Sequence, residues 1–85
     1  GVHMTISAQE ASHKAAEYFR EFTQDVYNLN ITVEEIEKNV DHWLITLGFA
    51  QKTYSISNPA AKEYKQFKVD LETGEVLSMK IRTLN

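Results

Sequence analysis

The spacing of apolar residues changes once along this chain, and that change limits the fold more than any other feature. Between residues 8 and 26 the apolar positions lie three or four apart, and from residue 43 onward many lie two apart. Spacings of three and four place side chains on one face of a helix, whereas a spacing of two places them on one face of a strand. The chain is therefore expected to form one helix followed by strands, an α+β domain.

The predicted helix has a well-marked start. Ser7 and Glu10 fit a capping box, in which the Ser7 hydroxyl accepts a hydrogen bond from the Glu10 backbone N–H. The helix is expected to end near Tyr27, before the polar segment that follows it. Its apolar stripe is expected to face the core and consists of Ala8, Ala11, Ala15, Tyr18, Phe19, Phe22 and Val26.

Four strands are predicted, over residues 31–38, 43–50, 66–71 and 76–82. The first lacks clean alternation and reads as an edge strand. A turn is expected over 39–42, a loop over 55–63, and a tight turn over 70–74 in which Gly74 suits a positive φ. Short connections favour a four-stranded antiparallel meander. One sheet face should pack on the helix through Trp43, Ile45, Leu47, Phe49, Phe67, Val69, Leu77, Met79 and Ile81.

Length and composition exclude several classes of protein. The 85 residues suit one domain, here residues 4–85, because Gly1 to His3 are interpreted as a cloning remnant. With 12 acidic and 9 basic residues and no basic cluster, nucleic acid is not an expected partner. No apolar run approaches the roughly 18 residues of a membrane span, so membrane insertion is not expected. The compartment stays open: cytoplasmic if Met4 is the natural start, extracytoplasmic if a signal peptide was trimmed.

The residue types that carry chemistry do not form a recognisable site. The chain has no cysteine, and no nucleophile is placed beside a base and an acid. His13 is expected at the surface, and His42 is expected to contact Asp41 in a turn. Glu35 and Glu37 share a strand face without a histidine. The sequence therefore predicts no enzyme, no cofactor and no metal.

The second face of the predicted sheet is the main functional candidate. No segment of the chain is left to cover it, so it should meet water or another molecule. Gly48 on this face is expected to mark a bulge or the close approach of another backbone. The leading prediction is a non-enzymatic protein-interaction module, inhibitory or regulatory, that binds a protein partner or itself through this face or an edge strand. The candidate contact residues are Leu44, Thr46, Tyr54, Tyr64, Gln66, Lys68, Lys80 and Arg82.

The segment 64–77, YKQFKVDLETGEVL, resembles the terminal hairpin of PepSY-type domains. Such domains show an aromatic strand, then Val-Asp, then Thr-Gly-Glu-Val. The resemblance implies a helix packed on an antiparallel sheet, cystatin-like in outline, without catalysis and with a role in binding or restraining peptidases. A weaker likeness, to gas-vesicle accessory proteins, is carried by a tryptophan strand, a loop with proline and a Val-Asp hairpin.

Two other functions stay open. A small-molecule or enzymatic pocket between helix and sheet is one, since the small side chains of Ala8, Ala11 and Ala15 leave room there. Its mouth would be lined by His42, Trp43 or Tyr54. The other is a structural subunit of a larger assembly, which a large apolar patch on the uncovered face would favour.

Overall fold

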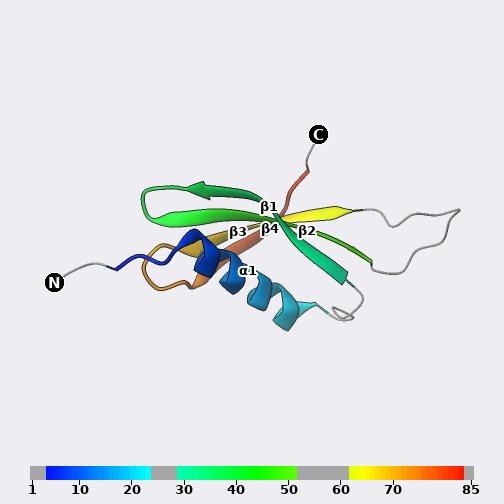
Figure 1. The fold of residues 1–85 in the computed structure, drawn as a ribbon, viewed down its shortest axis with the longest axis horizontal. Helices are drawn as coiled ribbons and strands as arrows, with labels where there is room; N and C mark the ends of the chain where they lie inside the picture. Colours follow the sequence, from blue (N-terminus) through cyan, green and yellow to red (C-terminus); the bar gives the residue numbers. More distant parts are fainter. Residues whose placement is uncertain (1–3, 24–28, 52–61, 84–85) are drawn as a thin grey trace, which may run out of the picture.

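The chain folds as one helix packed on a four-stranded antiparallel sheet (Figure 1). The structure is a computed structural model, and it describes residues 4–23, 29–51 and 62–83. The elements are α1 (Ala8–Phe22), β1 (Leu29–Lys38), β2 (His42–Gln51), β3 (Glu63–Asp70) and β4 (Val76–Ile81). The sheet order is β1-β2-β3-β4, so each strand pairs with its neighbour in sequence. The predicted α+β class and meander topology are confirmed, and β1 is an edge strand as expected.

Helix α1 begins where the sequence indicates and ends earlier than expected. The Ser7 hydroxyl accepts from the Glu10 backbone N–H at 3.0 Å. The predicted end near Tyr27 is wrong, because Thr23 is already extended, with φ −125° and ψ 129°. A β-branched residue loses side-chain freedom in a helix and favours extended backbone, which fits this position. Val26, expected in the apolar stripe, lies outside the described residues.

The core lies between α1 and the central strands. Helix and sheet aromatic rings meet twice: Phe19 stacks on Phe49 with centroids 4.6 Å apart, and Tyr18 meets Phe67 edge-on at 6.4 Å. Edge-on and tilted arrangements suit the charge distribution of aromatic rings. The buried cluster consists of Ala11, Ala15, Phe19, Ile45, Leu47, Phe49, Phe67 and Val69.

A bulge in the last hairpin changes which side chains of β4 face the helix. The register shifts between Lys68 and Val69, so Val69 pairs with Val76. Val76 therefore packs against the core, and Leu77, predicted there, is 49% exposed. An extra residue in one strand moves every later side chain to the other face unless the pairing readjusts.

Two further residues predicted in the core are exposed. Ile81 lies opposite Lys65, on the helix-facing side of the sheet, but is 84% exposed. Phe22, in the last turn of α1, is 66% exposed and contacts Tyr18 at a centroid distance of 4.7 Å. Alternation selects a face of the sheet, but burial also requires an element above that face.

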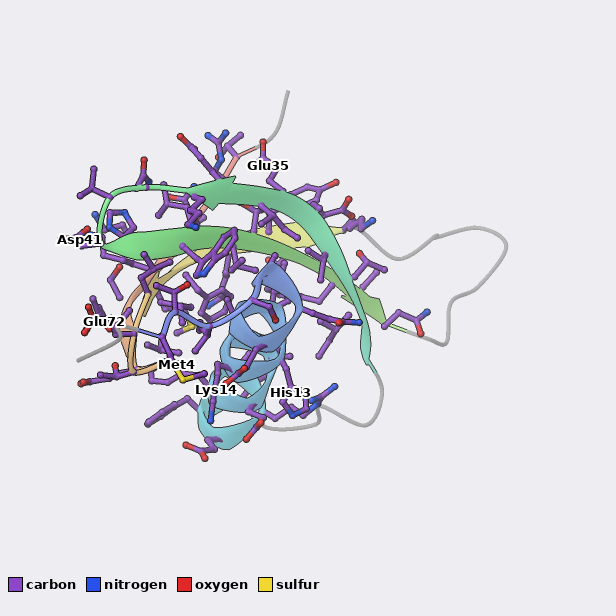
Figure 2. All side chains as sticks on the ribbon, turned by 60° about the vertical axis from the view of Figure 1, so that its left-hand side comes forward. Met4, His13, Lys14, Glu35, Asp41 and Glu72 are labelled. Atoms are coloured by element: carbon purple, nitrogen blue, oxygen red, sulfur yellow. The ribbon has the colours of Figure 1, made fainter. Side chains whose placement is uncertain are left out.

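Two hydrogen bonds tie the segment before α1 to the rest of the fold, and a third joins the two turns beside it. The Ile6 backbone N–H donates to the Leu71 carbonyl at 2.8 Å, and the Trp43 indole N–H donates to the Ile6 carbonyl at 3.1 Å. The Leu71 N–H donates in turn to the Asp41 carbonyl at 3.1 Å. These bonds join the start of α1 to both turns at one end of the sheet, where Figure 2 shows Asp41 and Glu72.

The predicted turn over 70–74 is confirmed. One carboxylate oxygen of Asp70 accepts from the backbone N–H groups of Glu72 and Thr73, both at 2.9 Å. These bonds hold the pKa of Asp70 below its usual value. Gly74 has φ 78°, which a residue without a Cβ adopts readily.

Candidate functional site

The sheet face turned away from α1 is called the open face here. Side chains alternate along a strand, so the neighbours of the buried Ile45 and Leu47 point away from the helix. Among the described residues, α1 is the only regular element outside the sheet, and it lies on the other side. Figure 2 shows Glu35 across the sheet from His13 and Lys14 of α1. The open face consists of Thr32, Glu34, Glu35, Glu37, Leu44, Thr46, Gly48, Lys62, Tyr64, Gln66, Lys68, Ser78, Lys80 and Arg82.

The strand registers arrange this face in rows that run across the sheet. Glu35, Thr46, Gln66 and Lys80 form one row, in the order β1 to β4. A second row contains Glu37, Leu44, Lys68 and Ser78. In a third row Thr32, Gly48 and Tyr64 follow one another, and the Arg82 backbone N–H donates to the Tyr64 carbonyl at 3.0 Å.

The predicted contact residues come together on this face, with two exceptions. Tyr54 lies outside the described residues. Thr46 is only 1% exposed, because the Glu35 side chain lies over it and accepts from its hydroxyl at 2.9 Å. Thr46 therefore supports Glu35 and offers little surface of its own. The others lie on the open face, namely Leu44, Tyr64, Gln66, Lys68, Lys80 and Arg82.

Opposite charges occupy opposite sides of the open face. The carboxylates of Glu34, Glu35 and Glu37 all belong to β1. The basic side chains lie on β3 and β4 or next to their ends, and they are Lys62, Lys68, Lys80 and Arg82. The sequence showed that Glu35 and Glu37 share a strand face, but the distance of 45 positions between Glu35 and Lys80 hides that they belong to one row.

Glu35 and Arg82 connect the two sides. The Arg82 Nε–H donates to a Glu35 carboxylate oxygen at 3.3 Å, next to the bond from Thr46. The bond from Thr46, and then the one from Arg82, hold the pKa of Glu35 below its usual value. A hollow of about 430 Å³ lies beside this contact and is lined by Glu35, Ile36, Glu37, Leu44, Thr46, Gln66 and Arg82. Carboxylate and guanidinium groups on its walls can hold charged or hydrogen-bonding groups.

Gly48 lies beneath a second ion pair. Lys62, just before β3, pairs with Glu34 of β1, so the two side chains cross β2. A Cβ at Gly48 would lie 2.7 Å from the Glu34 carboxylate oxygen and 2.8 Å from the Lys62 Cε. The expected close approach at Gly48 thus comes from side chains and not from backbone, and the bulge lies in β1 between Val33 and Glu35. The hydrogen bond from Lys62 lowers the pKa of Glu34, and the same bond raises the pKa of Lys62.

His42 makes the predicted contact with Asp41. Its Nδ1 lies 2.6 Å from the Asp41 carboxylate, and its Nε2 lies 3.2 Å from the Asn39 side-chain nitrogen. Hydrogen bonding to His42 lowers the pKa of Asp41. Both ring nitrogens are engaged within the turn between β1 and β2, so the arrangement braces that turn and presents no free base.

His13 is exposed on α1 and lies 2.7 Å from Glu17, as a surface histidine would. Over residues 4–23, 29–51 and 62–83, no group of three or more potential ligands could hold a metal ion. In the same ranges no helix is long and apolar enough to cross a membrane.

Two of the three alanines expected over a pocket belong to the core. Ala11 and Ala15 have no exposed surface and pack within the core cluster. Trp43, expected at a pocket mouth, is engaged by Ile6. A further hollow, of about 370 Å³, lies at the far strand ends and is lined by Phe49, Lys62, Glu63, Tyr64, Lys65, Ile81, Arg82 and Thr83. The small-molecule alternative stays a prediction.

Comparison of the chain with protein-family models, with curated proteins and with solved structures gave no match. On the open face no helix or strand of the described residues covers the sheet, two ion pairs lie across its strands, and the charges are separated by sign.

Proposed function

We propose that this protein is a non-enzymatic interaction module that binds a protein partner through the open face. The observation that carries the proposal is the separation of charge on a sheet face that no helix or strand of the described residues covers. Carboxylates line β1 and basic side chains line the β3–β4 side, with the half-buried Leu44 and Gln66 between them. Complementary charges steer and orient a protein partner, and a central strip of lower charge allows close packing.

A finer assignment is part of this proposal. We propose that the chain is a cystatin-like domain of PepSY type with an inhibitory or regulatory role. The hairpin from Tyr64 to Leu77 supports it, since the Val-Asp pair ends β3 and the Thr-Gly-Glu-Val run makes the turn into β4. One helix on a four-stranded meander is also the outline that this resemblance implies.

Site-directed photo-crosslinking tests whether the open face binds protein. A photoreactive amino acid at Gln66 samples the middle of the open face, and the same group at Glu17 samples the exposed side of α1. Each variant is illuminated at equal concentration, both purified and in an extract of the source cells. We expect protein adducts from Gln66 and none from Glu17, and the Gln66 adducts should weaken when Lys68→Glu is added.

Each outcome bears on the proposal. An adduct that forms at Gln66, is absent at Glu17 and depends on Lys68 supports binding through the open face. The same adducts from both positions would indicate nonspecific capture and overturn the proposal. An absence of adducts from Gln66, in a variant whose circular dichroism matches that of the unmodified protein, would overturn it as well.

A further inference from the structure

We propose that the partner of the open face is a second copy of this chain, packed face to face about a two-fold axis parallel to the strands. The inference rests on the proposed function, which requires only that the open face binds protein. It adds the identity of the partner and the geometry of the contact. The observations behind it are the strand order, the rows of the open face and the separation of charge across them.

Symmetry restricts how two identical sheets can meet face to face. A two-fold axis that runs across the strands places β1 of one copy over β1 of the other. That arrangement brings the carboxylates of Glu35 and Glu37 near their own counterparts. An axis parallel to the strands instead places β1 over β4 and β2 over β3. Opposite charges then meet along both sides of the interface, so the charge pattern selects this axis.

The row that contains Glu35 and Lys80 is complementary to itself under this operation. Rotation about the strand direction leaves the position along the strands unchanged, so each row faces itself in reverse order. Glu35 therefore lies opposite Lys80 of the second copy, and the contact occurs twice. In the third row Tyr64 lies opposite Gly48 of the second copy, which the Glu34–Lys62 ion pair covers.

Charged side chains are available for these contacts. Within the described ranges, the ion pairs of the open face are Glu34–Lys62 and Glu35–Arg82, and neither includes Lys80, Lys68 or Glu37. Lys80 is exposed, and the hollow beside Glu35 and Glu37 is the surface that a lysine from the opposite copy would reach. The ammonium group of Lys80 can thus approach two carboxylates without breaking the Glu35–Arg82 contact.

A second copy presents opposite charge to both halves of the open face, whereas a partner of uniform charge does so for only one half. A polyanion would be repelled by β1, and a polycation by the β3–β4 side. Four strands about 4.8 Å apart and about six residues at roughly 3.3 Å each give a face about 20 Å on a side. That is smaller than the roughly 800 Å² per partner of a stable complex, so we expect a weak dimer that salt dissociates.

Charge reversal on the two sides tests the proposed pairing. The variants are Lys80→Glu and Glu35→Lys, each alone and in an equimolar mixture, and sedimentation equilibrium gives Kd at low and high salt. In each single variant the facing charges repel at both symmetric contacts, and we expect Kd to rise at least about tenfold. In the mixture, glutamate at 80 faces lysine at 35 in one contact, and the native Glu35 faces the native Lys80 in the other. The mixture should therefore form heterodimers with near native affinity.

Controls separate the charge contact from effects on folding. Glu17→Lys makes the same charge change on the exposed side of α1 and should leave Kd unchanged. Lys80→Glu alters an exposed residue and should keep the native thermal transition, so its effect on Kd is interpretable even if Glu35→Lys unfolds. With that variant unfolded, Lys80→Glu still weakens the dimer if the inference is right.

The inference and the proposed function can fail separately. A protein that remains monomeric at millimolar concentration and low salt overturns the dimer. If crosslinks from Gln66 still capture a different protein, the proposed function stands. A dimer that neither charge reversal weakens overturns this geometry, because it must use another surface. A dimer that each variant alone weakens and that the mixture of the two variants restores supports both the dimer and the proposed function.

Discussion

Two residues on the helix-facing side of the sheet should differ sharply in their contribution to stability. Phe67 and Ile81 share that face by register, but Phe67 is 0% exposed and Ile81 is 84% exposed. Phe67 pairs with Ile45 and Met79 and meets the ring of Tyr18. Truncation of a buried phenylalanine to alanine costs about 3–5 kcal/mol, whereas an exposed residue costs about 0.5 kcal/mol or less.

The size of the domain sets the consequence. For a chain of 85 residues, the free energy of unfolding is about 4–13 kcal/mol. Phe67→Ala thus removes a large share of it and lowers Tm by at least about 12 °C, at about 4 °C or more per kcal/mol. Phe67→Leu keeps part of the packing and should cost about 1–2 kcal/mol, which stays measurable if the alanine variant does not fold.

Urea denaturation followed by circular dichroism measures the difference. The slope of the free energy against urea should be the same in the parent protein, Phe67→Leu and Ile81→Ala, because all three expose nearly the same surface on unfolding. Equal losses for Phe67→Leu and Ile81→Ala would refute the reasoning. They would mean that the face is covered to its end and that Ile81 belongs to the core.

Two further predictions concern polar contacts. Gly48→Ala adds a Cβ whose nearest neighbour is the Glu34 carboxylate. In a Glu34→Ala background, which removes that carboxylate, Gly48→Ala should stabilise the protein by about 0.4–1 kcal/mol. In the parent protein, Gly48→Ala should stabilise less, since that Cβ would meet the Glu34 carboxylate oxygen at 2.7 Å. Urea denaturation of the parent, the two single variants and the double variant measures both changes in stability. Equal gains in the two backgrounds would contradict the reasoning. The pKa of Asp70 is lower in the folded state, so its contribution to stability is present above its unfolded pKa of about 4 and is lost as pH falls through the folded value. Asp70→Asn should flatten the loss of Tm below about pH 4, and an unchanged acid profile would argue against this role.

Local signals in the sequence were enough for the elements and their order. The change of apolar spacing predicted one helix and four strands, and Ser7 and the turn that starts at Asp70 lie where their side chains cap backbone N–H groups. These features depend on residues close together in the chain, so their physical chemistry can be read without the fold. The burial of Phe67 followed from its position in an alternating segment, as expected.

The tertiary structure decided what those signals leave open. A bulge turned Leu77 outward and Val76 inward, since a shift of one residue exchanges the two faces of a strand. Ile81 kept its face of the sheet but is 84% exposed. Lys80 and Glu35 came into one row only through the pairing of three strand interfaces. Burial and charge pattern on a sheet depend on contacts between segments far apart in sequence, and those contacts are set when the chain packs as a whole.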